Sequence, residues 1–152
     1  MVLSAFLVED RPDIRDTLVD AMEEAAPLKF VGQAATEAVA RKWLTSNHGH
    51  WDLAIVDLFL REGTGFGVLK DCQNRSPRQK VVVLTSYLQD RVMVHCKDLG
   101  ADAVFDKEQD VEQLVEFCRA HAEELESMDS MGMGLITNFA DFDTAQDGIP
   151  NP

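Results

Sequence analysis

Charged and hydroxyl side chains follow several apolar segments that have the composition of buried strands. Glu9 and Asp10 follow "LSAFLV", Asp57 ends "DLAIVD", Thr85 ends "KVVVLT" and Lys107 follows "ADAVFD". An ionised carboxylate in apolar surroundings is costly unless it has a partner. Three carboxylates that converge in one cleft repel one another, which raises their pKa values unless a cation is bound. A few hard oxygen ligands with room for water are typical of a Mg²⁺ site rather than a Zn²⁺ site.

The elements that would position these side chains alternate along the chain. Strands are expected at 3–8, 28–35, 52–57, 80–86 and 101–107. Helices are expected at 13–25, at 37–44 after a Thr36 cap, through Leu69 and Cys72, at 90–99 and at 110–126. Five strand–helix units predict an α/β fold, a doubly wound parallel sheet with helices on both faces. Ligands bind such sheets beyond the C-terminal strand ends, near the point where strand order reverses.

Length and composition favour an ordinary globular protein. The chain has 152 residues, of which 45% are hydrophobic and 27% are charged. No apolar stretch approaches the roughly 20 residues of a membrane span, and charged residues follow the first apolar run too soon for a signal peptide. We therefore expect a cytoplasmic protein. Its three cysteines form no CxxC pair, which argues against a disulfide framework or a zinc site and predicts buried free thiols.

The negative charge is concentrated toward the C-terminus. Residues 1–105 hold 12 Lys/Arg and 15 Asp/Glu, whereas residues 106–152 hold 2 and 12, within a net charge of −13. Nucleic-acid binding needs clustered cations, so it is not expected there. From residue 127 the helical pattern stops. We expect a domain at 1–126 and an acidic C-terminal tail at 127–152, which is either disordered or docks through apolar residues such as Phe139 and Phe142.

Taken together, the motifs resemble the receiver domain of two-component response regulators. The resemblance covers roughly residues 3–122 and lies in "VEDRPDIR", "IVDLFLREGTGFGVL", "VVVLTS", "DLGADAVFDK" and the closing helix, in this order. Gly65, eight residues after Asp57, and Gly100 ahead of Lys107 fit the same pattern. The resemblance implies a flavodoxin-like, five-stranded sheet of order 2-1-3-4-5 and a stand-alone, single-domain response regulator.

The resemblance also implies a role for each candidate site residue. Asp57 would be the phosphoacceptor, Thr85 and Lys107 would contact the phosphoryl group, and Mg²⁺ would be held by Glu9, Asp10, Asp57 and the main-chain carbonyl of Phe59. A carboxylate is a competent nucleophile for phosphoryl transfer once the charge on the transferring group is neutralised. Thr85 offers a hydroxyl that could move toward the new phosphoryl oxygens, which would convert a charge change into a loop shift.

The same resemblance implies the partners. The phosphoryl group would come from a histidine kinase or a histidine phosphotransfer protein, within a phosphorelay. Such a domain is a signalling phosphoacceptor rather than an enzyme, although it is expected to phosphorylate itself from small phosphodonors and to dephosphorylate itself. We expect its output to pass through contact with an unknown protein target, without direct binding to nucleic acid or a membrane.

Three positions depart from the family pattern. Glu108 follows Lys107 where proline is frequent, and Val104 stands where many members have an aromatic switch residue. Phe105 should point to the opposite side of its strand. Tyr87, two residues after Thr85, either stands over the site and slows the access of water or is a half-exposed loop aromatic.

Competing interpretations fit less well. A haloacid-dehalogenase-type phosphatase needs a second Asp where Phe59 stands, and a flavin or dinucleotide fold needs amide donors where "VEDRPD" has carboxylates. A degenerate receiver that serves as a docking module without phosphorylation remains the alternative. His48 and His50 are interpreted as solvated loop residues. Trp43 and Trp51 are interpreted as packing residues.

Overall fold

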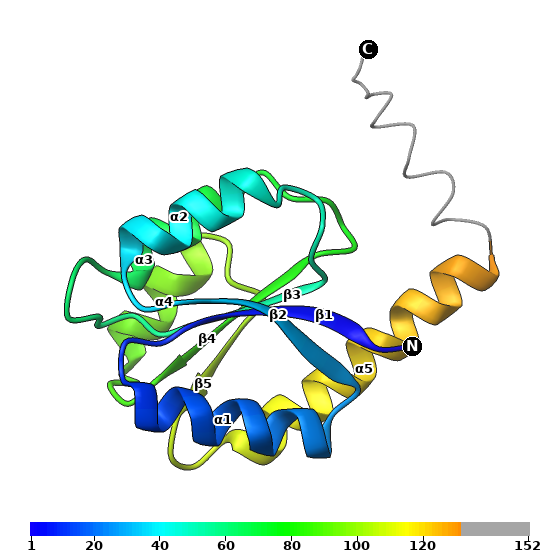
Figure 1. Cartoon of the computed structure of the whole chain (residues 1–152), viewed down its shortest axis with the longest axis horizontal. Coiled ribbons are helices and arrows are strands. Elements are labelled where there is room, and N and C mark those ends of the chain that lie inside the picture. The colour runs from blue at the N-terminus through cyan, green and yellow to red at the C-terminus, as the bar shows by residue number, and fades with distance from the viewer. Residues whose placement is uncertain (132–152) are drawn as a thin grey trace. The chain divides into compact units, whose positions relative to one another are not determined.

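The computed structural model describes residues 1–131, and five parallel strands form one sheet in it (Figure 1). The strands are β1 (Leu3–Val8), β2 (Leu28–Ala34), β3 (Leu53–Val56), β4 (Lys80–Thr85) and β5 (Ala103–Asp106). Their order is β2-β1-β3-β4-β5, as predicted. Because β1 pairs with β2 on one side and with β3 on the other, the strand order reverses at β1. The C-terminal ends of β1 and β3 therefore form the position at which sheets of this type bind ligands.

Five helices connect and follow the strands. They are α1 (Pro12–Ala25), α2 (Glu37–Ser46), α3 (Gly65–Asp71), α4 (Asp90–Asp98) and α5 (Val111–Ser130). Local sequence explains several of their ends. Pro12 opens α1, where its missing N–H has no helical partner to lose. The Thr36 side chain accepts a hydrogen bond from the Val39 N–H, 3.2 Å away, which confirms the predicted cap of α2. Gly100, with φ of 101°, follows the end of α4.

The predicted end of the last helix was wrong. Helix α5 continues four residues past Glu126, to Ser130, and the Met131 N–H still donates to the Ser127 carbonyl at 3.1 Å. The apolar spacing ends at Leu125, but a solvated helix continues while its residues tolerate helical backbone, and no Gly or Pro occurs before Gly132. The remainder of the predicted tail, including Phe139 and Phe142, lies outside the described residues.

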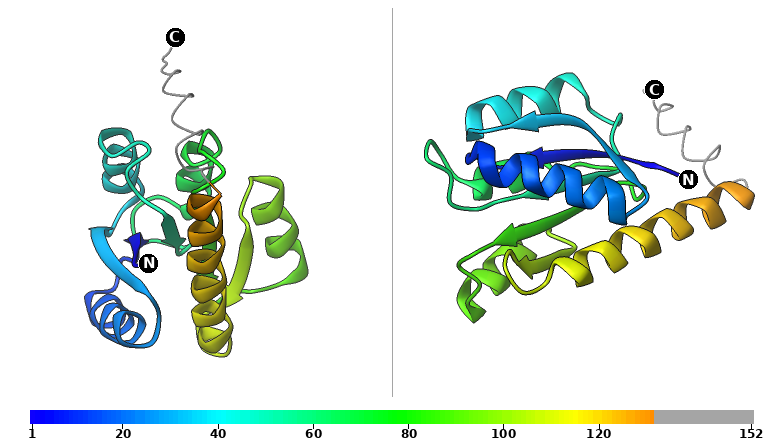
Figure 2. Two further views of the ribbon diagram at one scale, coloured as in Figure 1. Left: turned by 90° about the vertical axis from the view of Figure 1, so that its right-hand side faces the viewer. Right: turned by 60° about the horizontal axis from the view of Figure 1, so that its bottom comes forward.

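Alternating strand side chains divide the core between the two faces of the sheet. Phe6 and Val8 belong to a buried cluster with side chains from α2, α3 and α4. Successive side chains of a strand point to opposite faces, so Leu3, Ala5 and Leu7, which are also buried, belong to the opposite face of the sheet. Helix α1 and the first two turns of α5 cover that face (Figure 2). Trp43 stacks on Phe6 with ring centroids 4.0 Å apart, and Trp51 is buried, so both tryptophans are packing residues as predicted. All four residues of β3 are buried, which explains why its sequence does not alternate.

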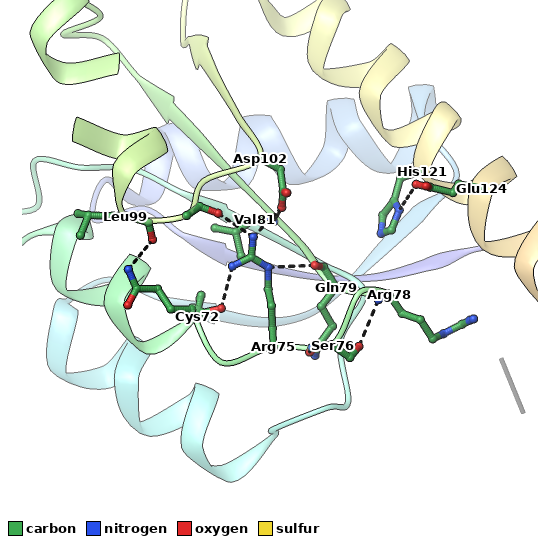
Figure 3. A network of polar contacts seen from close by, with 12 residues as sticks. Cys72, Arg75, Ser76, Arg78, Gln79, Val81, Leu99, Asp102, His121 and Glu124 are labelled. Carbon is green, nitrogen blue, oxygen red and sulfur yellow. Dashed lines mark hydrogen bonds and ion pairs between the residues drawn. The ribbon is translucent and has the colours of Figure 1, made fainter. Parts of the chain in front are cut away.

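Two compact units make up the described chain. Residues 2–118 form the unit that contains the sheet, and Met1 with residues 119–131 belongs to the other. In the latter unit the Met1 ammonium pairs with the Glu126 carboxylate, and His121 Nδ1 lies 4.0 Å from Glu124 Oε1 (Figure 3). None of the helices in residues 1–131 is long and apolar enough to cross a membrane.

Arg75 ties together the loops that precede β4 and β5 (Figure 3). Its guanidinium donates hydrogen bonds of 2.7 to 3.0 Å to the carbonyls of Cys72, Gln79 and Gly100 and to the carboxylate of Asp102. The Asp102 carboxylate also accepts the N–H of Val81, the second residue of β4, at 2.8 Å. These bonds fix β5 against β4 at the edge of the sheet where the strands begin, and so fix the point at which Lys107 leaves β5.

The three cysteines are buried free thiols, as predicted. Burial raises the pKa of Cys72 to about 12, although the nearby Arg75 charge opposes the shift. Burial likewise raises the pKa of Cys96 to about 11 and that of Cys118 to about 12. Because the thiolate is the reactive form, these thiols are inert at neutral pH while the protein is folded.

Ellman's reagent at pH 8 should therefore modify the folded protein slowly. Since raised pKa values and burial both reduce the accessible thiolate, we expect each thiol to react at least roughly 100-fold more slowly than in guanidinium chloride. The measurement is the absorbance of released thionitrobenzoate with and without denaturant. A thiol that reacts equally fast in both conditions would contradict the burial of that cysteine.

Candidate functional site

The predicted site residues all stand at the carboxyl edge of the sheet. Glu9 and Asp10 follow β1, Asp57 follows β3, Thr85 ends β4 and Lys107 follows β5. Backbone hydrogen bonds continue the sheet for one residue beyond these strand ends. The N–H of Asp57 donates to the Val8 carbonyl at 3.1 Å, and the N–H of Lys107 donates to the Thr85 carbonyl at 2.9 Å. The side chains therefore leave the sheet at fixed points next to one another.

Three carboxylates meet at this edge. Glu9, Asp10 and Asp57 each offer one oxygen, and these oxygens lie within 4.8 Å of one another. Glu9 is only 1% exposed and Asp57 only 7%. The Lys107 ammonium joins them: its Nζ lies 2.6 Å from Glu9 Oε1 and 2.9 Å from Asp57 Oδ2. The sheet thus brings together the three carboxylates and the lysine that were predicted from the sequence.

Burial and mutual contact change the pKa values of Glu9 and Lys107. Burial raises the pKa of Glu9, and the hydrogen bonds from Lys107 and from the Arg11 N–H only partly oppose this. For Lys107, burial acts to lower the pKa, but the hydrogen bonds and charges of Glu9 and Asp57 outweigh it, so the pKa is raised above its ordinary value. The ammonium form of Lys107 is therefore stable at neutral pH and supplies a positive charge directly beside Asp57.

Backbone amides orient the two carboxylates that follow β1. The Arg11 N–H donates to Glu9 Oε2 at 3.1 Å. The Arg61 N–H donates to Asp10 Oδ2 at 2.7 Å, which connects Asp10 to the loop between β3 and α3. Asp10 is partly exposed, unlike Glu9. The carboxylate cluster is consequently buried on one side and open to solvent on the other.

The loop between β3 and α3 (residues 57–64, here the β3–α3 loop) folds back on itself beside Asp57. The Gly65 N–H donates to the Leu58 carbonyl at 2.7 Å, and Phe59 pairs with Thr64 in an isolated antiparallel bridge. A Cβ on Gly65 would lie 2.2 Å from the Asp57 carbonyl oxygen. Glycine at position 65 is therefore required for the close approach of α3 to the backbone of Asp57.

Thr85 and Tyr87 lie on the β4 side of the site. Thr85 is buried, and its Oγ1 accepts the Tyr87 N–H at 3.2 Å. Tyr87 is 62% exposed, and its ring contacts that of Phe59 edge to face with centroids 5.1 Å apart. Phe59 in turn contacts Phe66 edge to face at 6.1 Å. Tyr87 is thus an exposed loop aromatic that belongs to an aromatic cluster, a contact that its sequence position did not indicate.

Comparison with known proteins decides the family. The family model of the response regulator receiver domain matches residues 5–119. The chain belongs to this family. DNA-binding transcriptional activator DevR/DosR from Mycobacterium tuberculosis is 31% identical over 100 residues, which are 66% of this chain and 45% of that protein. The chain spans about half the length of the curated relatives that it matches.

Solved structures agree on the fold of this receiver domain. The BeF3-activated N-terminal receiver domain of RstA from Klebsiella pneumoniae superposes with a TM-score of 0.67 at 19% identity, covering 78% of this chain and 97% of that one. A response regulator from Burkholderia pseudomallei, solved with a phosphorylated aspartic acid, a calcium ion and citrate, superposes with a TM-score of 0.64 at 23% identity. That comparison covers 85% of this chain and 74% of that one.

The departures from the receiver pattern have visible consequences. Val104 is partly buried and packs against the cluster under α2, α3 and α4, whereas Phe105 contacts Phe117 of α5 with centroids 6.0 Å apart. The two side chains lie on opposite sides of β5, as predicted. After Lys107, the N–H of Glu108 donates to Asp106 Oδ1 at 2.8 Å. An Asx turn, in which the Asp106 side chain bonds the backbone two residues later, therefore forms the segment in which many family members have proline.

The histidine pair of the "NHGH" loop forms no metal site in the described residues. His48 Nε2 lies 3.3 Å from the carbonyl of Asn74, and His50 is exposed. Among residues 1–131, the group of three side chains whose geometry suits a metal ion is the carboxylate trio at the sheet edge.

Sequence reasoning missed Glu37, which contacts the β3–α3 loop. Its Oε1 accepts the N–H of Thr64 at 2.9 Å across a sequence separation of 27 residues. A glutamate at the start of a helix is an ordinary N-terminal acid, so its position alone did not distinguish it. The two glycines that make room for it, Gly63 and Gly67, were the available signal.

Replacing Gly65 with alanine should destabilise the receiver domain. The added Cβ would lie 2.2 Å from a backbone oxygen and 2.9 Å from the Leu58 Cα, so the backbone must shift. We expect the free energy of unfolding in urea to fall by about 1–3 kcal/mol. An unchanged urea midpoint would show that α3 does not approach the Asp57 backbone as closely as described.

Proposed function

We propose that Asp57 accepts a phosphoryl group from a histidine kinase or a histidine phosphotransfer protein. The observation that carries this proposal is the nearly buried Asp57 carboxylate, held by the Lys107 ammonium at 2.9 Å with two further carboxylates close by. In the transfer, an Asp57 oxygen forms a bond to phosphorus while the bond from phosphorus to the donor nitrogen breaks. Membership of the receiver family supports this assignment, because receiver domains take phosphoryl groups from histidine kinases.

The carboxylate cluster fits a divalent cation. Three hard oxygen donors lie within 4.8 Å of one another, and the single Lys107 ammonium offsets only part of their charge. Receiver domains typically bind Mg²⁺ at an acidic pocket. Glu9, Asp10, Asp57 and the main-chain carbonyl of Phe59 would hold Mg²⁺ here. The bound ion would supply neutralisation of the charge on the phosphoryl oxygens.

Lys107 and Thr85 act on the phosphoryl group in this proposal. The Lys107 ammonium is already aimed at Asp57, so it is placed to neutralise a phosphoryl oxygen without a large movement. The Thr85 hydroxyl accepts the Tyr87 N–H and keeps its own hydrogen available for donation. A phosphoryl oxygen that takes this hydrogen would pull Thr85 and, through it, the segment that carries Tyr87.

The output of the domain is proposed to be protein contact. The net charge of −13 makes contact with nucleic-acid phosphates unfavourable for this chain. The DNA-binding activity named for DevR/DosR belongs to a protein of which the matched region is 45%. A receiver that only docks would need the fold but not the carboxylate cluster, whose burial is costly. The presence of this cluster therefore favours phosphorylation over a docking role alone.

Acetyl phosphate with Mg²⁺ should add one phosphoryl group to the protein. We expect the intact mass to rise by one phosphoryl group, since small phosphodonors can replace the kinase when the acceptor is activated within the domain itself. Asp57→Asn should abolish the gain because the amide is a poor nucleophile, and chelation of the metal should also abolish it. If the mass stays unchanged, and incubation with phosphorylated histidine kinases also gives no transfer, the docking role is favoured.

Asp10→Ala should weaken Mg²⁺ binding. The substitution removes one of three charged oxygen ligands, so we expect the dissociation constant for Mg²⁺ alone, measured by titration calorimetry, to rise at least about tenfold. Asp20→Ala, at an exposed position on α1, is the matched control and should leave the affinity unchanged. Equal affinities of wild type and Asp10→Ala would remove Asp10 from the metal site.

A further inference from the structure

Glu37 holds the β3–α3 loop from outside the carboxylate cluster. It is the first residue of α2, and its N–H donates to the Glu62 carbonyl at 3.1 Å. Its Oε1 accepts the Thr64 N–H at 2.9 Å. One residue therefore bonds the loop at two points, once with its backbone and once with its side chain.

Gly63 of the β3–α3 loop and Gly67 of α3 leave the space that Glu37 occupies. A Cβ on Gly67 would lie 1.9 Å from Glu37 Oε2, and one on Gly63, whose φ is 84°, would lie 2.4 Å from Glu37 Cβ. Helix α3 has no side-chain hydrogen bond from its N-cap Thr64 and no acidic residue in its first turn. The Glu37 carboxylate, which belongs to α2, accepts the N–H at the start of α3 instead. A negative charge is favourable at the N-terminus of a helix.

Arg41 fixes the direction of the Glu37 carboxylate. Its Nη1 donates to Glu37 Oε2 at 3.1 Å, and its Nε and Nη2 donate to the two carboxylate oxygens of Asp71 at 2.8 and 3.1 Å. The Thr64 N–H, together with Arg41, holds the pKa of Glu37 below its ordinary value. The Glu37 carboxylate is therefore ionised and accepts hydrogen bonds from both Arg41 of α2 and Thr64 at the start of α3.

Thr64 connects Glu37 to the candidate metal site. It pairs with Phe59 in the isolated bridge, and the Phe59 carbonyl is a ligand in the proposed function. We propose that Glu37 is a positioning residue that fixes the main-chain carbonyl of Phe59 for the metal by holding Thr64. This inference rests on the proposed function, because it concerns the same metal site.

Two substitutions separate positioning from a simple effect of charge. Glu37→Gln keeps the reach of the side chain and one oxygen that can accept the Thr64 N–H, but it removes the charge and the second acceptor oxygen, to which Arg41 donates. Glu37→Asp keeps the charge but shortens the side chain by one methylene group, so the contact with Thr64 is lost. If Glu37 acts only by attracting the cation through space, the glutamine variant must be the weaker binder. If Glu37 positions the loop, the aspartate variant must be the weaker binder.

The experiment is a titration of each variant with Mg²⁺ alone, followed by calorimetry, together with amide exchange of Thr64. We expect Glu37→Asp to raise the dissociation constant about tenfold and to speed exchange of the Thr64 amide. Glu37→Gln should stay within about twofold of wild type in both measurements. Glu24→Asp, at an exposed position on α1, is the matched control and should change neither. Urea unfolding of each variant shows that it is folded.

The outcomes distinguish this inference from the proposed function. Absence of Mg²⁺ binding by the wild type, or its independence of Asp10, would overturn the proposed metal site and the positioning role together. If wild type and Asp10→Ala behave as expected but Glu37→Asp binds Mg²⁺ like wild type, only the positioning role fails. A glutamine variant that binds Mg²⁺ more weakly than the aspartate variant would also overturn it, since loss of the charge would then matter more than loss of the contact with Thr64.

Discussion

The contact of the Lys107 ammonium with Glu9 and Asp57 is the interaction on which the site depends. Two nearly buried carboxylates lie side by side at the ends of β1 and β3, and a buried charge without a partner is strongly destabilising. Lys107 leaves β5, which is separated from β3 by β4. Its side chain must therefore reach across the end of β4, and it meets both carboxylates only because the strand order and register bring the strand ends level.

This requirement explains features far from the site. β5 has only four residues and pairs with β4 alone, so its own ladder gives limited control of the point at which Lys107 emerges. The Arg75 and Asp102 contacts secure β5 at its opposite end, where they tie the loops that precede β4 and β5. A network at one edge of the sheet thus supports the geometry at the other edge, although no residue of that network contacts the carboxylates.

The sequence predicted those parts of the structure that repeat or that are local. The alternation of strands and helices predicted the parallel sheet. Polar side chains at the strand ends predicted that Glu9, Asp10, Asp57 and Lys107 lie together, because parallel strands end at a common edge. The Thr36 cap was predictable because it involves neighbouring residues. Glu37 and Arg75 were missed, since each contacts distant segments through residue types that are ordinary on a surface. The end of α5 was misjudged because apolar spacing marks a buried stripe rather than the helix boundary.

The two sides of the site differ in how firmly they are held. On the β3 side, Asp10 bonds the backbone of Arg61 and Glu37 bonds that of Thr64, so the loop beside the Phe59 carbonyl is fastened at both ends. On the β4 side, the Thr85 hydroxyl bonds the backbone of Tyr87, whose ring is largely exposed. A metal site needs fixed ligands, whereas a signal needs a segment that can move. In the proposed function, a charge gained at Asp57 is therefore expected to leave the β3–α3 loop in place and to act on Thr85, through which it reaches the exposed Tyr87.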